Sequence, residues 1–119
     1  MPELPEVETT LRGIAPHVVG RALTELIIRQ PRLRWPIPPE LADLCVGRKL
    51  LKVLRRGKYL LLDFGNGHAL IHLGMSGSLR IVKPDEPPSY HDHFDLVLGK
   101  QVLRYCDPRR FGCLLWVEG

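Results

Sequence analysis

Apolar residues near the N-terminus recur with the period of an α-helix. Four of them are spaced by three or four positions and therefore share one helical face: Leu4, Val7, Leu11 and Ile14. We predict a helix from about Pro5 to Ala15. Pro16 and Gly20 are residue types that commonly end helices, so we expect the helix to end there.

Beyond this helix the apolar residues form short runs separated by turns. Gly65–Gly67 and Gly74–Gly77 are glycine-rich segments typical of turns between strands. The proline-rich stretches Gln30–Pro39 and Pro84–Ser89 are predicted to be loops, and Pro39–Leu44 to form one or two helical turns. The predicted strands are Ala22–Arg29, Lys49–Arg55, Lys58–Phe64, His68–Leu73, Ser78–Val82, Phe94–Leu98, Val102–Cys106 and Cys113–Val117.

Short strands with a turn every few residues are typical of a β-sandwich. We therefore predict a mainly β fold. It is a two-sheet antiparallel β-sandwich of about eight strands, with an N-terminal α-helix and a second short helix. The chain has 119 residues and shows neither an internal repeat nor a linker, so we expect residues 1–119 to form a single domain.

Composition narrows the class of protein. No apolar run approaches the roughly 20 residues of a membrane span, and no signal segment opens the chain, so we expect a cytoplasmic protein. Lys and Arg number 17 against 13 Asp and Glu, and a net charge of +4 is compatible with a polyanionic partner. Cys45, Cys106 and Cys113 form no C-x-x-C pair, which favours reduced, mostly buried thiols over a zinc site or a disulfide framework.

The chain opens with Met1-Pro2-Glu3. A small second residue permits removal of Met1, which would leave proline with a free secondary amine. An α-amino group titrates near neutral pH, so much of it can be neutral and nucleophilic towards the aldehyde carbon of a sugar. Glu3 could then move protons on and off that sugar. The alternative is structural, because proline and acidic residues are also common at the start of a helix.

Arg55-Arg56-Gly57-Lys58-Tyr59 lies between two predicted strands. Such a segment can contact phosphates and bring a lysine close to a reacting sugar. We expect Lys58 to open the second strand, which is a more rigid platform than a loop tip. A solvated turn is the alternative interpretation.

Two other turns carry side chains suited to a disrupted base stack. Met75 lies in the turn between His72 and Ser78, where an exposed apolar side chain can act as a wedge. Asp107–Gly112 supplies two arginines for phosphates or unpaired bases, and a phenylalanine for stacking. The alternatives are a methionine folded onto the core and an ordinary basic hairpin.

His91-Asp92-His93 places two imidazoles on one face of a strand-like segment. This spacing would suit a metal ion, but no third ligand is evident in the sequence. A phosphate or sugar contact, or an ordinary surface position, fits better, so we predict no metal site.

These segments occur in one order along the chain. The segments are Pro2–Glu8, Arg32–Pro36, Arg55–Leu60, His72–Ser78, His91–His93 and Asp107–Gly112. In this order they resemble the N-terminal catalytic domain of bacterial formamidopyrimidine-DNA glycosylases, from Met1 to about Val117. The resemblance implies base-excision DNA repair. The family excises oxidised purines, 8-oxoguanine and formamidopyrimidines, from duplex DNA and then cuts the backbone on both sides of the abasic sugar as an AP lyase.

The resemblance assigns catalytic roles to three residues. Pro2, once Met1 is removed, resembles the nucleophile that attacks the sugar C1′ and forms a Schiff base. Glu3 resembles its acid/base partner. Lys58 resembles the second essential amine, which contacts the backbone beside the lesion.

The resemblance also assigns contacts with DNA. His72, His91 and Arg109 resemble residues that bind DNA. Met75, Arg109 and Phe111 resemble the probes that fill the gap left by the flipped base. These assignments imply a double-stranded DNA partner containing oxidised purines or abasic sites, bound by a monomer in the bacterial cytoplasm at the nucleoid.

The chain departs from the family pattern in length. Longer members continue into a helix-two-turns-helix segment and a four-cysteine zinc finger, and neither is present in this sequence. We therefore expect a catalytic domain alone, as an expressed piece, a fragment or a truncated gene product. We expect no cofactor, no zinc in this chain and impaired turnover.

Two other functions are compatible with the sequence. One is a catalytically silent module that binds DNA or another partner on the same sandwich, and retention of Met1 would favour it. The other is the related glycosylase branch for oxidised pyrimidines. The Pro2–Glu6 opening and the Arg109–Phe111 run argue against that branch, by resemblance.

Overall fold

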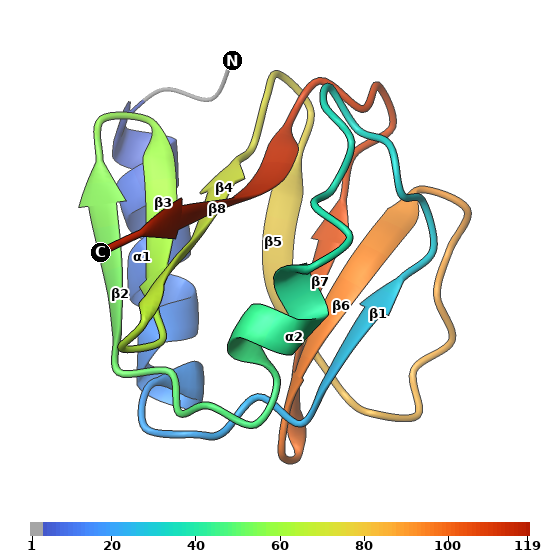
Figure 1. The fold of residues 1–119 in the computed structure, drawn as a ribbon. Coiled ribbons are helices and arrows are strands. Elements are labelled where there is room, and N and C mark those ends of the chain that lie inside the picture. The colour runs from blue at the N-terminus through green and yellow to red at the C-terminus, as the bar shows by residue number, and fades with distance from the viewer. Residues whose placement is uncertain (1–3) are drawn as a thin grey trace.

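Two four-stranded antiparallel sheets face each other across one core in the computed structural model, which describes residues 4–119 (Figure 1). The elements are α1 (Leu4–Val18), β1 (Glu25–Ile28), α2 (Leu41–Cys45), β2 (Lys52–Arg56), β3 (Tyr59–Asp63), β4 (Gly67–His72), β5 (Ser78–Val82), β6 (Asp92–Leu98), β7 (Gln101–Cys106) and β8 (Cys113–Glu118). The predicted mainly β sandwich with an N-terminal helix and a short second helix is confirmed.

The strand order places segments that are distant in sequence side by side. One sheet has the order β1-β6-β7-β5 and the other the order β2-β3-β4-β8. The pairing of β6 with β7 shifts register between Asp92 and Phe94, so His93 is the extra residue of a β-bulge. A bulge interrupts the regular alternation of side chains along a strand, which bears on the face that the sequence pattern assigned to both His91 and His93.

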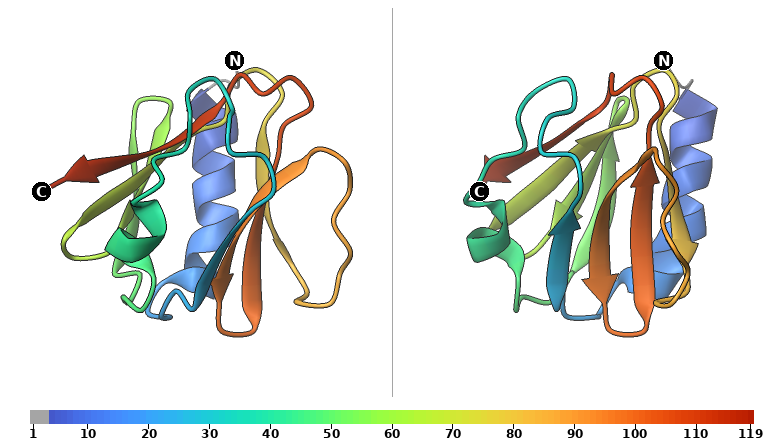
Figure 2. Two further views of the ribbon diagram at one scale, coloured as in Figure 1. Left: turned by 45° about the vertical axis from the view of Figure 1, so that its right-hand side comes forward. Right: turned by 90° about the vertical axis from the view of Figure 1, so that its right-hand side faces the viewer.

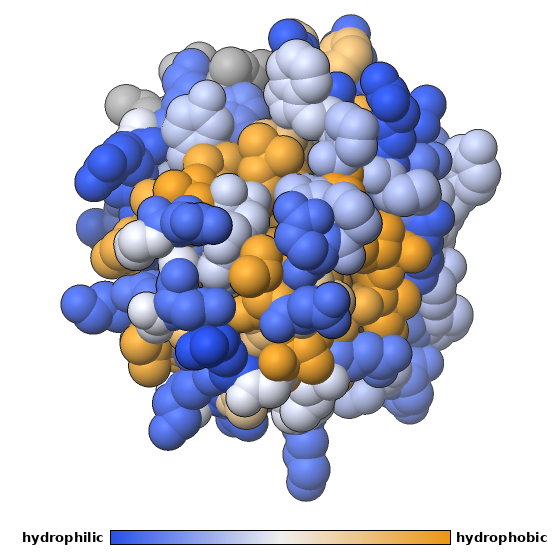
Figure 3. Space-filling model, viewed as in Figure 1, coloured by the Kyte–Doolittle hydropathy of each residue, from blue (hydrophilic) through white to orange (hydrophobic). Residues whose placement is uncertain are grey.

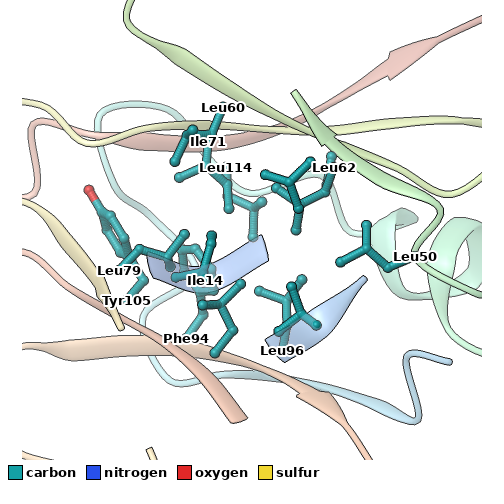
Figure 4. Packing of buried hydrophobic residues seen from close by; sticks show 14 of the residues in the cluster. Ile14, Leu50, Leu60, Leu62, Ile71, Leu79, Phe94, Leu96, Tyr105 and Leu114 are labelled. Carbon is teal, nitrogen blue, oxygen red and sulfur yellow. The ribbon is translucent and has the colours of Figure 1, made fainter. Parts of the chain in front are cut away.

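The core lies between the inner faces of the sheets (Figure 4). Leu60, Ile71 and Leu114 come from one sheet and are fully buried. From the other sheet, the Phe94 and Tyr105 rings stack with centroids 4.8 Å apart and planes inclined by 16°. Burial alternates with period two along β3 and β4, whereas β6 and β7 are buried almost continuously.

Helix α1 packs beside both sheets, next to β5 of one and β2 of the other (Figure 2). Its apolar stripe buries Val7 and Ile14 as predicted, and extends to Val18, which is fully buried. The predicted end at Pro16 is wrong, because the helix continues to Val18 with Pro16 inside it. Pro16 leaves the Arg12 carbonyl without its usual amide donor. The last turn still closes, because Val18 is buried and the Val19 amide donates to the Ala15 carbonyl.

Strand boundaries differ from the predictions by a few residues. The first strand begins at Glu25 instead of Ala22, and β2 begins at Lys52 instead of Lys49. Ala22 and Lys49 instead form an isolated bridge with each other. The connection between α1 and β1 is thus held next to the start of β2, although it is not part of a sheet.

Several turns gather at the end of the sandwich where α1 begins. These are the β2–β3 turn, the β4–β5 turn, the β7–β8 loop and the loop that follows β1 (Figures 1 and 2). In the space-filling view, hydrophobic residues are visible in the middle of the face shown and hydrophilic residues predominate around its margin (Figure 3). Four of the predicted site residues lie on these turns, namely Lys58, Met75, Arg109 and Phe111.

Three further observations bear on the sequence predictions. Among residues 4–119 no helix is long and apolar enough to cross a membrane. Cys45 and Cys113 are buried and Cys106 is half-buried, and all three are free thiols. Burial raises the pKa of Cys45 to about 11, which makes this thiol unreactive at neutral pH.

Candidate nucleic-acid interface

The two N-terminal residues of the predicted site, Pro2 and Glu3, lie outside the described residues. Their roles as nucleophile and acid/base partner stay predictions. The structure does describe the start of α1 at Leu4, which lies at the same end as the turns (Figure 2).

Lys58 lies in the turn between β2 and β3, and the prediction that it opens a strand is wrong. Arg56 pairs with Tyr59, so Gly57 and Lys58 are the two residues of the turn. Gly57 has a φ of +60°, whereas Lys58 has no positive φ. This combination is typical of a type II′ turn, in which glycine takes the first central position. A two-residue turn clamped by its strands still holds Lys58 on a short, rigid connection.

An ion pair attaches this turn to α1. The Arg55 Nε lies 2.7 Å from Glu8 Oε1, and Arg55 Nη1 donates to the Gly57 carbonyl at 3.1 Å. The hydrogen bond from Arg55 is the largest cause of the lowered pKa of Glu8. Arg55 is therefore committed to a contact within the protein, although the sequence pattern grouped it with phosphate ligands.

His72 ends β4 beside the turn of Lys58. Its Nδ1 accepts a hydrogen bond from the Gly74 amide at 3.2 Å, and its ring centroid is 5.0 Å from that of Tyr59. Burial lowers the pKa of His72, and the positive charges of Lys58 and Arg34 lower it further. The imidazole is thus neutral at physiological pH, and Nε2 carries the proton that could be donated to a phosphate oxygen.

Met75 and Phe111 are exposed and line one hollow. Met75 is 60% exposed and Phe111 is 39% exposed, so neither side chain belongs to the core. The hollow has a volume of about 560 Å³ and is also lined by Trp35, Tyr59 and His72. Two turns that are more than thirty residues apart in sequence therefore present apolar side chains to the same space.

Arg109 is exposed and lies over the Phe111 ring, with its guanidinium carbon 4.6 Å from the ring centroid. A cation at this distance from an aromatic face is attracted by the ring quadrupole. Both residues also line a neighbouring hollow of about 410 Å³ together with Arg32. The structure thus brings together the three residues predicted to fill a gap in DNA.

His91 and His93 differ in their environment. His91 is half-buried, whereas His93 is 5% exposed and its Nε2 lies 2.6 Å from the Asp107 carbonyl. The β-bulge places His93 in this contact, so its Nε2 is engaged within the protein although His93 lines the same hollow as His91. His91 lines a hollow of about 380 Å³ with Arg29 and Arg110. Arg29 donates a hydrogen bond to the Asp95 carboxylate at 2.6 Å.

Within residues 4–119 no group of three or more His, Cys, Asp or Glu side chains is placed to hold a metal ion. The ring centroids of His91 and His93 are 6.4 Å apart. The residues that the structure describes therefore do not fit a zinc site.

The sequence patterns missed two residues at this end. Trp35 is 52% exposed and the Arg34 guanidinium lies 5.6 Å from its ring, so a second cation–aromatic pair borders the hollow of Met75. The sequence did contain a signal for Trp35, because it is an aromatic residue in the arginine-containing loop Arg32–Pro36. Asp107 is fully buried among the turns. As part of an Asp-Pro pair it resembled an ordinary turn residue.

Comparison with known proteins connects this geometry to one family. The family model described as the formamidopyrimidine-DNA glycosylase N-terminal domain matches residues 1–114. The chain belongs to the formamidopyrimidine-DNA glycosylase family. The resemblance found in the sequence motifs is confirmed.

Three individual proteins of this glycosylase family illustrate the similarity. The formamidopyrimidine-DNA glycosylase of Cellvibrio japonicus is 71% identical over the whole chain, which covers 44% of that protein. The Lactococcus lactis enzyme in complex with Fapy-dG-containing DNA has a TM-score of 0.90 at 30% identity. MutM in complex with carbocyclic 8-oxo-G-containing DNA has a TM-score of 0.91 at 31% identity. Each structural match covers 98% of this chain and 44% of the other.

The chain thus spans less than half the length of the glycosylases that it matches. The similarity covers the whole sandwich and the turns at its end. The roles of the individual site residues stay predictions, and they are taken up in the proposal below.

Proposed function

We propose that residues 1–119 form the N-terminal catalytic domain of a bifunctional DNA glycosylase/AP lyase that removes oxidised purines from duplex DNA. The observation that carries this proposal is the gathering of Lys58, His72, Met75, Arg109 and Phe111 at the end where α1 begins. The relatives crystallised with damaged DNA support the substrate class, namely 8-oxoguanine and formamidopyrimidine lesions.

The exposed side chains meet the first requirement of the reaction. A damaged base must leave the stack before its glycosidic bond is accessible, which costs a few kcal/mol. Met75 and Phe111 are exposed on adjacent turns and can occupy the space that the base leaves. Arg109 can donate hydrogen bonds to the unpaired partner base while it remains stacked on Phe111.

The chemical steps rest on the residues at the start of the chain. The Pro2 amine attacks the sugar C1′, so that the N–C1′ bond forms as the bond to the base breaks and the base leaves with a proton. Opening of the sugar, with a proton from Glu3, gives an iminium adduct at C1′. Proton loss from the adjacent sugar carbon then expels the 3′ phosphate, and a second elimination expels the 5′ phosphate.

The cationic and imidazole groups hold the DNA backbone in this scheme. Lys58 is half-buried in a tight turn, which favours a contact with one phosphate over free movement in solvent. His72 and His91 contact further phosphates through ring N–H groups. We place the protein as a monomer on DNA in the bacterial cytoplasm, at the nucleoid.

Borohydride trapping tests the proposal. The protein is mixed with duplex DNA that contains an abasic site, reduced with borohydride, and analysed by intact mass and peptide sequencing. We expect a cross-link on Pro2 in protein that lacks Met1. Pro2→Gly keeps an amine and should retain part of the cross-link, whereas protein that retains Met1 should lose most of it.

Two results would contradict the assignment. A cross-link that maps to Lys58 alone would exclude Pro2 as the nucleophile. DNA binding without any cross-link, in protein shown to lack Met1, would favour the catalytically silent DNA-binding module. Because mass and adduct are measured on one sample, these outcomes are distinguished from incomplete removal of Met1.

A further inference from the structure

The Asp107 carboxylate connects the turn of Met75 with the loop of Phe111. It is fully buried, and each of its oxygens accepts two hydrogen bonds. Oδ1 accepts from Ser76 Oγ at 2.8 Å and from the Arg110 amide at 3.1 Å. Oδ2 accepts from Tyr105 Oη at 2.7 Å and from the Gly112 amide at 2.9 Å. Ser76 is adjacent to Met75, and the two amide donors flank Phe111.

The four donors come from separate parts of the fold. Ser76 lies in the β4–β5 turn, Tyr105 in β7, and Arg110 and Gly112 in the β7–β8 loop. Burial raises the pKa of Tyr105 far above its ordinary value, and the nearby Asp107 carboxylate raises it further, so the phenol stays protonated and donates. One carboxylate therefore orients both turns.

The main chain of Asp107 is held as well. Its amide donates to the His91 carbonyl at 3.0 Å, and its carbonyl lies 2.6 Å from His93 Nε2. These bonds join the start of the β7–β8 loop to the bulged end of β6. The carboxylate is consequently anchored on the sandwich, whereas the side chains of Met75 and Phe111 project into solvent.

The two turns also touch through their backbones. A Cβ atom added to Gly74, which has a φ of +69°, would lie 2.6 Å from the Gly112 amide nitrogen. A Cβ atom on Gly112 would overlap Tyr105 Oη and the His72 carbonyl. Glycine at both positions lets the backbones approach, and the shared carboxylate determines how they are aligned.

We propose that Asp107 is a positioning residue that locks the β4–β5 turn and the β7–β8 loop into one unit, so that Met75, Arg109 and Phe111 enter the DNA stack together. The inference rests on the proposed function for its consequence on DNA. The coupling of the two turns is a property of the free protein and can be measured without DNA. Pre-organised side chains lose less conformational entropy when they insert into DNA.

The first measurement reads the coupling in the protein alone. Ser76→Ala removes one donor to Oδ1 and leaves the other three. If Asp107 couples the turns, amide hydrogen exchange at Gly112, whose bond is to Oδ2, should accelerate by about threefold to tenfold in NMR spectra. Ser76→Thr keeps a hydroxyl and should restore slow exchange.

Ser78→Ala is the matched control, because Ser78 is exposed two residues later and donates no side-chain hydrogen bond among residues 4–119. The reverse experiment changes Asp107 and observes Met75. Asp107→Asn replaces one acceptor with a donor that faces two other donors. The Met75 methyl resonance should then shift towards the value of a free methionine side chain. Asp85→Asn makes the same chemical change at an exposed position and should leave that resonance unmoved.

A second measurement follows the consequence for DNA. 2-Aminopurine placed opposite an abasic-site analogue reports insertion of side chains into the stack through its fluorescence. Ser76→Ala and Asp107→Asn should reduce the fluorescence change, while the slope of log affinity against log salt stays as in the wild type. A mere loss of fold would alter both quantities.

The outcomes separate the inference from the proposed function. Unchanged Gly112 exchange in Ser76→Ala, or equal acceleration in Ser78→Ala, overturns the role of Asp107. If the wild-type protein itself gives no fluorescence change on the abasic duplex, the proposed function fails. The exchange data still decide whether Asp107 couples the turns.

Discussion

The Arg109 guanidinium lies over the Phe111 ring at 4.6 Å, and both side chains are exposed at the same end of the sandwich as Met75. An exposed phenylalanine held by a cation is poorly explained by packing, because it buries little apolar surface in the free protein. The arrangement is well suited to stacking on a base while a charged group remains close to the unpaired partner.

Phe111→Ala tests this arrangement. Stacking of a base on an aromatic side chain contributes about 1–3 kcal/mol, so we expect single-turnover excision from an 8-oxoguanine duplex to slow by about fivefold to more than a hundredfold. Borohydride trapping on a single-stranded abasic site needs no base flipping and should change much less. Leu54→Ala is a matched control, because Leu54 is exposed to a similar degree on β2, and it should leave both rates unchanged. Equal losses in the two assays would indicate damage to the catalytic residues.

Glu3→Gln tests the proposed acid/base role. The amide is almost isosteric with the carboxylate but cannot exchange a proton, and general acid–base catalysis typically contributes 10²–10⁴-fold. We expect base excision to slow by about that factor while the affinity for lesion-containing DNA is retained. Single-turnover rates and a binding isotherm in one buffer are compared with those of Glu40→Gln. A parallel loss of rate and affinity would make Glu3 a structural residue.

Lys58→Gln tests the phosphate contact. The isolated chain should bind duplex DNA weakly and with a marked salt dependence, because each neutralised phosphate contributes about −0.9 to the slope of log affinity against log salt. Removing one such contact should make the slope shallower by about one unit. Lys100 lies in the β6–β7 turn, at the opposite end of the sandwich, and Lys100→Gln should leave the slope unchanged. Tight, lesion-selective binding that is insensitive to salt would contradict this prediction.

His72 predicts a dependence of stability on pH. Burial, and secondarily the charge of Lys58, lowers its pKa in the folded protein below the ordinary 6.5. Between the lowered pKa and 6.5 the unfolded chain binds a proton that the folded chain does not, so the free energy of unfolding falls as the pH decreases through this window. Above pH 6.5 the imidazole is neutral in both the folded and the unfolded chain, so the folded protein has this loss of stability only at lower pH.

Urea unfolding of His72→Asn and wild type at pH 7.5 and pH 5.5 measures this effect. We expect the wild type to lose stability relative to the variant at the lower pH. His17→Asn changes an exposed histidine on α1 and should follow the wild type. If wild type and His72→Asn respond identically to pH, His72 is not the group responsible.

Much of the fold could be predicted from local patterns. The helical stripe indicated α1, and short apolar runs separated by glycine-rich turns indicated the strands. Both signals depend on residues that are close together in the sequence. The error at Pro16 has a tertiary origin. The burial of Val18 extends the helix beyond a residue that locally disfavours it. Lys58 was misplaced because the type of a two-residue turn depends on the pairing of its strands, and here Arg56 pairs with Tyr59.

The candidate site likewise combines features that the sequence determined with features that only the tertiary structure decided. The order of the motifs by itself determined the family and named Met75, Arg109 and Phe111, since residue identities and spacing are properties of the chain. Only the tertiary structure decided that Met75 and Phe111 line one hollow and that Asp107 joins their turns. It also decided that Arg55 is committed to Glu8. The Ser76–Asp107 and Met75–Phe111 relationships join residues more than thirty positions apart and arise when the β4–β8 and β5–β7 pairings form. The Arg55–Glu8 contact arises when α1 packs against β2. No local pattern encodes which distant donor will reach a given carboxylate.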